Sequence, residues 1–111
     1  ELPIPAEWRR TLSEIVDCLA SGDISRLPAA ASLSDERYLA IQDYVRSYGC
    51  ELRRLPDDAW RTSIYLWMGI YWQVLVDLFT VEEGASDLVL FVRVHPSEGS
   101  YRFEIESVHV P

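Results

Sequence analysis

The sequence predicts an α+β fold in which two N-terminal helices pack on one face of a four- to five-stranded antiparallel meander sheet. In the first half of the chain, apolar residues recur at helical spacing, whereas in the second half they alternate with polar residues. The run 71–80 is rich in β-branched and aromatic residues and holds no Gly or Pro, which is typical of a central strand. A length of 111 residues favours one domain spanning residues 1–111.

Two segments have the pattern of amphipathic helices. In residues 6–21 every third or fourth residue is apolar, and Gly22 is suited to cap the C-terminal end. A second helix is expected between Ser34, a typical N-cap residue, and Gly49, a typical C-terminal cap. Each helix has an apolar side to bury, and one face of the sheet is the natural place for both.

The pattern changes after the second helix. Residues 50–55 are expected to form a short strand at an edge of the sheet. Their two arginines suit an edge, because charged side chains there discourage pairing with another sheet. Residues 57–60 are typical of a single helical turn, and residues 64–68 alternate as a strand before Gly69 bends the chain. A helix over residues 57–68 is the alternative, because several of their large apolar residues also fit helical spacing.

The C-terminal part predicts a hairpin. Strands are expected at residues 88–95 and 100–110, joined by the four-residue loop between them. Pairing Val94 with Tyr101 keeps the core side chains on one face, as does the same register further along, with Val92 opposite Phe103 and Leu90 opposite Ile105. The alternation of the last strand then slips, which a bulge near residues 106–107 would explain.

The charge balance limits the possible partners. Eighteen acidic residues face ten basic residues, which gives a net charge of −8, and every basic residue is Arg. The absence of Lys excludes mechanisms that need a Schiff-base or P-loop lysine. Nucleic acid is not expected as a partner, because a net anion repels phosphates, whereas a basic protein would be attracted.

The sequence also bears on location. No apolar run is long enough to span a membrane, and the first residues lack the pattern of a signal peptide. We therefore expect a cytoplasmic protein without a membrane partner. In that compartment Cys18 and Cys50 are expected to be reduced thiols, with a disulfide as the alternative.

The central strand has apolar side chains on both of its faces. If one set of alternate residues faces the helices, the other set forms a second apolar face. It is made of Tyr71, Leu75, Phe79 and, from the next strand, Val89 and Phe91. One interpretation is that the N-terminal segment and residues 50–60 cover this face. The other is that it binds a partner protein or a second copy of the chain, with anchors at Tyr65, Trp67 and Tyr71.

Asp77 is the only formal charge within the central strand. A cross-strand ion pair with Arg93 is its expected role. The alternative is a general acid or base with a pKa raised by apolar surroundings, assisted by Tyr71 or Gln73.

Other polar residues give no sign of a metal site. The predicted turn at residues 81–87 holds three acidic residues, which are Glu82, Glu83 and Asp87. They lack the spacing of a calcium-binding loop and fit a solvated turn. His95 and His109 are expected at opposite ends of the C-terminal hairpin, so they are not expected to share a metal ion.

The segments Leu55–Trp60 and Trp67–Leu88 carry a resemblance to a known family. The second includes Trp72, then after Gln73 the run Val-Leu-Val-Asp-Leu-Phe-Thr, and after Val81 the run Glu-Glu-Gly-Ala-Ser-Asp-Leu. This resembles a family of small stand-alone bacterial proteins of unknown function, with Phe79 where the family pattern has Trp and Ala85 where it has Arg. The resemblance covers most of the chain and implies no catalytic residues. In size and acidity the chain is also similar to immunity proteins of bacterial toxin systems.

These observations favour binding over catalysis, with no cofactor. We expect a small acidic protein of the immunity or antitoxin type that binds a basic protein through its aromatic sheet face and acidic surface. The candidate partner-binding residues are Tyr65, Trp67, Tyr71, Leu75, Asp77, Phe79, Phe91, Glu82, Glu83 and Asp87. One alternative is a small-ligand-binding or enzymatic domain with a pocket around Asp77, Tyr71 and Trp72 between sheet and helix. Another is a homodimer through the sheet face.

Overall fold

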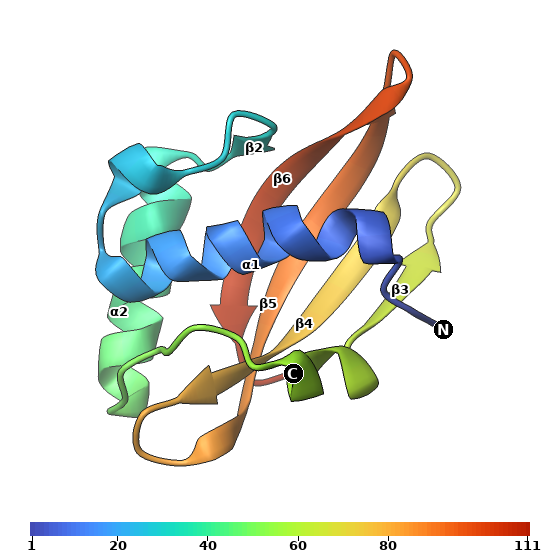
Figure 1. The fold of residues 1–111 in the computed structure, drawn as a ribbon. Coiled ribbons are helices and arrows are strands. Elements are labelled where there is room, and N and C mark those ends of the chain that lie inside the picture. The colour runs from blue at the N-terminus through green and yellow to red at the C-terminus, as the bar shows by residue number, and fades with distance from the viewer.

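The computed structural model describes residues 1–111 and has one mixed sheet of six strands in the order β1-β3-β4-β5-β6-β2 (Figure 1). The elements are β1 (Leu2–Pro3), α1 (Ala6–Ser21), β2 (Ala31–Ser32), α2 (Asp35–Tyr48), β3 (Ile64–Trp67), β4 (Trp72–Thr80), β5 (Gly84–Ser97) and β6 (Ser100–His109). Strands β3 to β6 form the predicted antiparallel meander. The prediction of a purely antiparallel sheet of four to five strands is wrong in detail, because β1 and the parallel strand β2 extend its edges. Strands of two residues have no periodicity that a sequence pattern can reveal.

The two predicted helices are confirmed, but they pack differently. Helix α1 crosses one face of the sheet and buries Trp8, Leu12 and Ile15 against it (Figure 1). Ser34 caps the N-terminal end of α2, and its Oγ accepts a hydrogen bond from the backbone N–H of Arg37. It stands beside β6 and has a single buried residue, so it closes the edge of the sheet more than it covers the face.

Strand β4 is the central strand that the sequence predicts. Its Val74, Val76 and Leu78 are fully buried on the side of α1, and the alternate residues point away from the helix. Burial on one side fixes which residues face inward, because a shift by one residue would turn the whole apolar set outward.

The C-terminal hairpin has a different register from the predicted one. Val94 lies opposite Phe103, not Tyr101, and the shift of two positions keeps the same side chains inside. The cause is a two-residue turn in which Glu98 and Gly99 have positive φ angles of 36° and 77°, as in the tight turns that suit twisted hairpins. The predicted bulge is confirmed, because Glu106 is the extra residue where the pairing of β5 with β6 shifts.

Two loop predictions are corrected. Strand β5 begins at Gly84, so the turn expected over 81–87 covers only 81–83. Residues 50–55 do not form an edge strand; a single bridge joins Leu52 to Thr80 at the end of β4, beyond the part that β3 pairs. A 3₁₀ turn follows at Asp57–Arg61, and the strand after it confirms the strand prediction over the alternative helix.

Candidate functional site

The face of the sheet opposite α1, called here the second face, carries most of the predicted partner-binding residues. Tyr71, Leu75, Asp77 and Phe79 from β4 and its start all belong to it, and all are half-buried. Phe91 from β5 lies directly opposite Leu75 on the same face.

No helix covers the second face. Helix α1 and the 50–61 segment lie on the other side of the sheet, and α2 stands at its β6 edge (Figure 1). Leu52, Leu55 and Trp60 pack against the core that α1 covers. The N-terminal strand β1 pairs with the edge of β3. The interpretation in which these two segments cover the second face is therefore wrong.

A polar network crosses part of this face. Arg93 Nε lies 3.1 Å from Glu106 Oε2, and its Cζ is 4.8 Å from the centre of the Tyr71 ring. Gln73 Nε2 donates a hydrogen bond of 2.8 Å to Glu106 Oε1. The expected ion pair between Asp77 and Arg93 is wrong. Arg93 on β5 lies opposite Gln73, and Gln73 is four residues before Asp77 on β4.

Asp77 does not belong to a pocket. Its backbone N–H donates to Ser63 Oγ at 2.9 Å, and its side chain points to the second face, away from the helices. Val89 lies opposite it. Asp77, Tyr71 and Trp72 do not line the cavities between the two helices, between α2 and β6, or beside the 50–61 segment. The expected pocket between sheet and helix is wrong for Asp77, because this side chain lies on the face of the sheet away from the helices.

The two histidines lie at opposite ends of the β5–β6 pair, as expected. His95 Nε2 is 2.9 Å from Glu104 Oε1, and Arg37 Nη1 is 3.2 Å from the other carboxylate oxygen. The hydrogen bond with His95, followed by that with Arg37, lowers the pKa of Glu104. The ring of His109 stacks on Phe91, with centroids 4.3 Å apart.

Two predicted anchors lie on the other side of the sheet. Tyr65 is opposite Val74 and meets Trp8 edge to face at 5.1 Å, and Trp67 is opposite Trp72 with ring centroids 4.8 Å apart. The expectation that both share a face with Tyr71 is therefore wrong. A tight turn between β3 and β4 places each of these residues opposite a helix-facing residue of β4.

The free end of the β3–β4 hairpin exposes three large apolar side chains. Trp67, Met68 and Ile70, called here the hairpin end, are 52%, 48% and 78% exposed. Gly69 has a φ of 98°, and Met68 N donates to Tyr71 O across the turn. The sequence prediction missed Met68 and Ile70. Large apolar residues on both sides of a turn glycine are a detectable signal, because such positions are ordinarily polar.

The predicted acidic residues lie at the opposite end of β4. Glu82, Glu83 and Asp87 are exposed, and Glu82 Oε1 accepts a hydrogen bond from the N–H of Glu51 at 3.0 Å. A hydrogen bond to Glu83 raises the pKa of Tyr48. Strand β4 has nine residues, so roughly 30 Å separate this acidic end from the hairpin end. The structure does not bring the acidic and aromatic candidates together.

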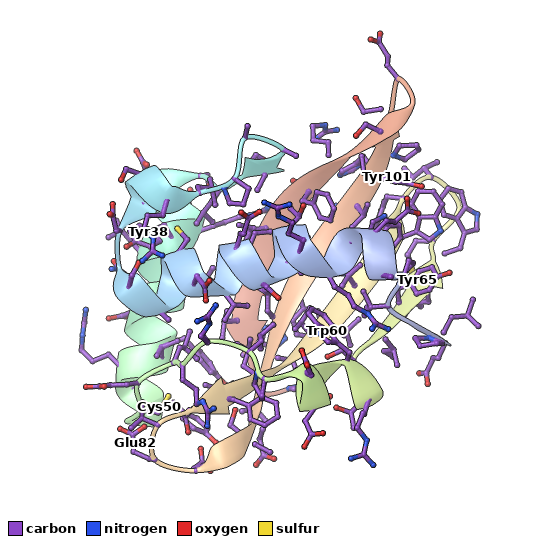
Figure 2. The ribbon with its side chains drawn as sticks, in the orientation of Figure 1. Tyr38, Cys50, Trp60, Tyr65, Glu82 and Tyr101 are labelled. Carbon is purple, nitrogen blue, oxygen red and sulfur yellow. The ribbon has the colours of Figure 1, made fainter.

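Both cysteines are free thiols, as expected. Cys18 is fully buried, and its thiol donates to the carbonyl of Asp23. Cys50 is half-buried near Glu82 at the acidic end (Figure 2).

Comparison with known proteins gives one match. The family model described as "Domain of unknown function (DUF7668)" matches residues 16–111. The chain belongs to this family. The DUF7668 match confirms the expected membership of an uncharacterised family, and no curated protein and no solved structure matches the chain. Neither helix of this DUF7668 protein has the length and apolar character needed to cross a membrane.

In this DUF7668 protein the last part of the stretch that carried the resemblance builds the turn from β4 to β5. The buried Thr80 accepts a hydrogen bond from the N–H of Glu83 at 3.0 Å. Ser86 Oγ donates to Leu78 O at 2.8 Å and accepts from the N–H of Leu88. These side chains satisfy backbone groups at an irregular point of the sheet. Thr80 and Ser86 of the motif therefore have a structural role at this turn.

Proposed function

We propose that this protein binds a basic partner protein, with the hairpin end as its apolar anchor and the second face as an adjoining contact surface. The observation that carries the proposal is the exposure of Trp67, Met68 and Ile70 together on one turn. Adjacent exposed apolar side chains are typical of protein-binding sites, and Trp and Met are enriched at interfaces. Tyr71 follows the turn and adds a second aromatic residue at the border of the second face.

The charge of the protein supports a basic partner. The net charge is −8, and the acidic end exposes Glu82, Glu83 and Asp87. A surface of this sign speeds the encounter with a positively charged protein and disfavours acidic competitors. An immunity or antitoxin role, in which the partner is a basic toxin, is one form of this function.

The test is recovery of the partner from the native host at low and moderate salt. Three tagged forms are compared, which are the unaltered chain, M68S/I70S and the control I24S/L39S. Ile24 and Leu39 are 45% and 64% exposed away from the hairpin, so the control removes similar apolar surface. We expect one stoichiometric basic protein with the unaltered chain and the control, and its loss with M68S/I70S. Recovery of no such protein, or equal recovery with all three forms, would contradict the proposal.

A homodimer is the second candidate, supported by the edge of β3. Strand β1 pairs only with Ile64 and Tyr65, so Leu66 and Trp67 leave an unpaired strand edge beside the hairpin end. An open edge next to apolar side chains is able to add a strand from a second copy. Sedimentation at two protein concentrations tests this candidate. A dimer that M68S/I70S dissociates supports it, and a monomer at both concentrations excludes it.

A further inference from the structure

Next to the hairpin end, on the helix side of the sheet, five aromatic side chains pack into one cluster. This aromatic cluster consists of Trp8, Tyr65, Trp67, Trp72 and Tyr101. Trp72 meets three of the other rings, with centroids 4.8 Å from Trp67, 5.5 Å from Trp8 and 6.0 Å from Tyr101, and Trp8 also meets three. Trp8 is 2% exposed and forms the floor, whereas Trp67 is 52% exposed and Tyr101 is half-buried. Tyr65 and Tyr101 both lie near the N-terminal end of α1 (Figure 2).

A carboxylate lies at the border of this cluster. Glu7, in the first turn of α1, is exposed, and the hydroxyl of Tyr101 donates to its Oε1 at 3.3 Å. The negative charge of Glu7 is the main reason that the pKa of Tyr101 is raised. Aromatic ring faces carry negative electrostatic potential, so rings and carboxylate together attract a cation. The nearby Arg9 does not fill this role, because it donates to Ile4 O and lies over the ring of Trp60.

We propose that the aromatic cluster and Glu7 bind the guanidinium group of an arginine side chain on the partner protein. The inference rests on the proposed protein-binding function and names the chemical group that this end of the molecule recognises. The rings touch one another, so a cation stacks on the outer surface of Trp67, Trp72 or Tyr101 and does not enter between them. A flat guanidinium suits such stacking and forms hydrogen bonds to a carboxylate in its own plane, which a compact ammonium does less well.

The test uses N-acetylarginine amide as the probe, with N-acetylcitrulline amide as its neutral analogue of nearly the same shape. The four tryptophans give separate indole N–H signals in a proton–nitrogen NMR spectrum, assigned with single Trp→Phe variants. We expect the arginine probe to shift the signals of Trp67 and Trp72 saturably, with millimolar affinity, and the citrulline probe to shift them little. The signal of Trp60, which lies outside the cluster under Arg9, serves as an internal control.

Paired variants locate the site. E7Q is expected to weaken arginine binding roughly fivefold, which corresponds to one exposed ion pair. E14Q removes an exposed carboxylate from the same helix, and we expect no such effect. W67L is expected to weaken binding while W67F keeps it, because Phe retains a ring face. Equal shifts with arginine and citrulline, or equal effects of E7Q and E14Q, would overturn the inference.

The outcome also separates this inference from the proposed function. Recovery of a host partner that M68S/I70S abolishes, together with no preference for arginine over citrulline, refutes the cation site and leaves protein binding in place. Arginine binding at the cluster without any stoichiometric host partner refutes the proposed protein-binding function and leaves the cation site in place.

Discussion

Replacing Ser63 by Ala tests how the segment before β3 is held against the sheet. Ser63 is 2% exposed, and its hydroxyl donates to Ala59 O at 2.7 Å and accepts from the N–H of Asp77 at 2.9 Å. One hydroxyl thus joins the 3₁₀ turn at 57–61 to the middle of β4. In S63A the N–H of Asp77 loses this partner in a place that water does not reach easily, and Ala59 O keeps only the hydrogen bond of 3.1 Å from the N–H of Ser63.

Two hydrogen bonds of about 1 kcal/mol each give an expected loss of about 2 kcal/mol in the free energy of unfolding. For a chain of this length, that loss corresponds to a decrease in Tm of roughly 8 °C. Urea unfolding of S63A measures it, with S47A as the control, because Ser47 is exposed on α2 and its replacement is expected to change stability by less than about 0.5 kcal/mol. If S63A and S47A unfold at the same urea concentration, the hydroxyl does not hold this segment and the reasoning is refuted.

Three further predictions concern a turn, an acid and the thiols. G69A is expected to lower stability by about 1 kcal/mol in urea unfolding, because Gly69 has a φ of 98° while its surroundings leave room for a Cβ atom; an unchanged midpoint would contradict this. E104Q is expected to be less stable than the unaltered chain at neutral pH and equally stable in strong acid. Because folding lowers the pKa of Glu104, its carboxylate stabilises the folded protein at pH values above the ordinary pKa of Glu. This contribution is lost as the pH falls through the pKa of Glu104 in the folded protein. When alkylation of the thiols is followed by mass spectrometry, Cys50 is expected to react slowly and Cys18 only after unfolding, since burial is the main cause that raises the pKa of both thiols. E82Q is expected to speed the reaction of Cys50, because the charge of Glu82 also raises the pKa of that thiol. Rapid labelling of Cys18 in the native protein would contradict its burial.

The parts of the fold that the sequence predicted are those fixed by burial on one side. The inward set of β4 and the core side of α1 follow from periodicity, because each misplaced residue would put a large apolar side chain in water. The bulge at Glu106 was detectable for the same reason, since the alternation had to be restored before Val108. The register of the β5–β6 hairpin was not fixed in this way. Pro96 suggested a loop, whereas the structure tolerates it within β5 and turns at Glu98 and Gly99.

In the candidate site, too, the face that a residue takes within a strand was predictable, and the pairing between strands was not. Periodicity placed Leu75, Phe79 and Phe91 on the second face correctly, because it fixes the face of residues within one strand. The placement of Tyr65 and Trp67 depended on the length of the turn between β3 and β4, and a change of one residue there reverses the face. Ion pairs depend on register in the same way. Sequence patterns therefore predict which face a residue takes more reliably than which residue it meets.

The separation of the two ends of β4 limits how the partner is recognised. At physiological ionic strength, electrostatic forces between exposed charges fade over about 8 Å, which is much shorter than the roughly 30 Å along β4. Glu82, Glu83 and Asp87 therefore cannot strengthen a contact confined to the hairpin end, although they contribute to attraction before contact. A partner that gains bound-state affinity from the acidic end must also lie along the second face, across the polar network around Glu106. Such a partner dissociates faster when the acidic end is neutralised by E82Q/E83Q. A partner confined to the hairpin end changes only its association rate, so the two rates measured across a salt series distinguish these geometries.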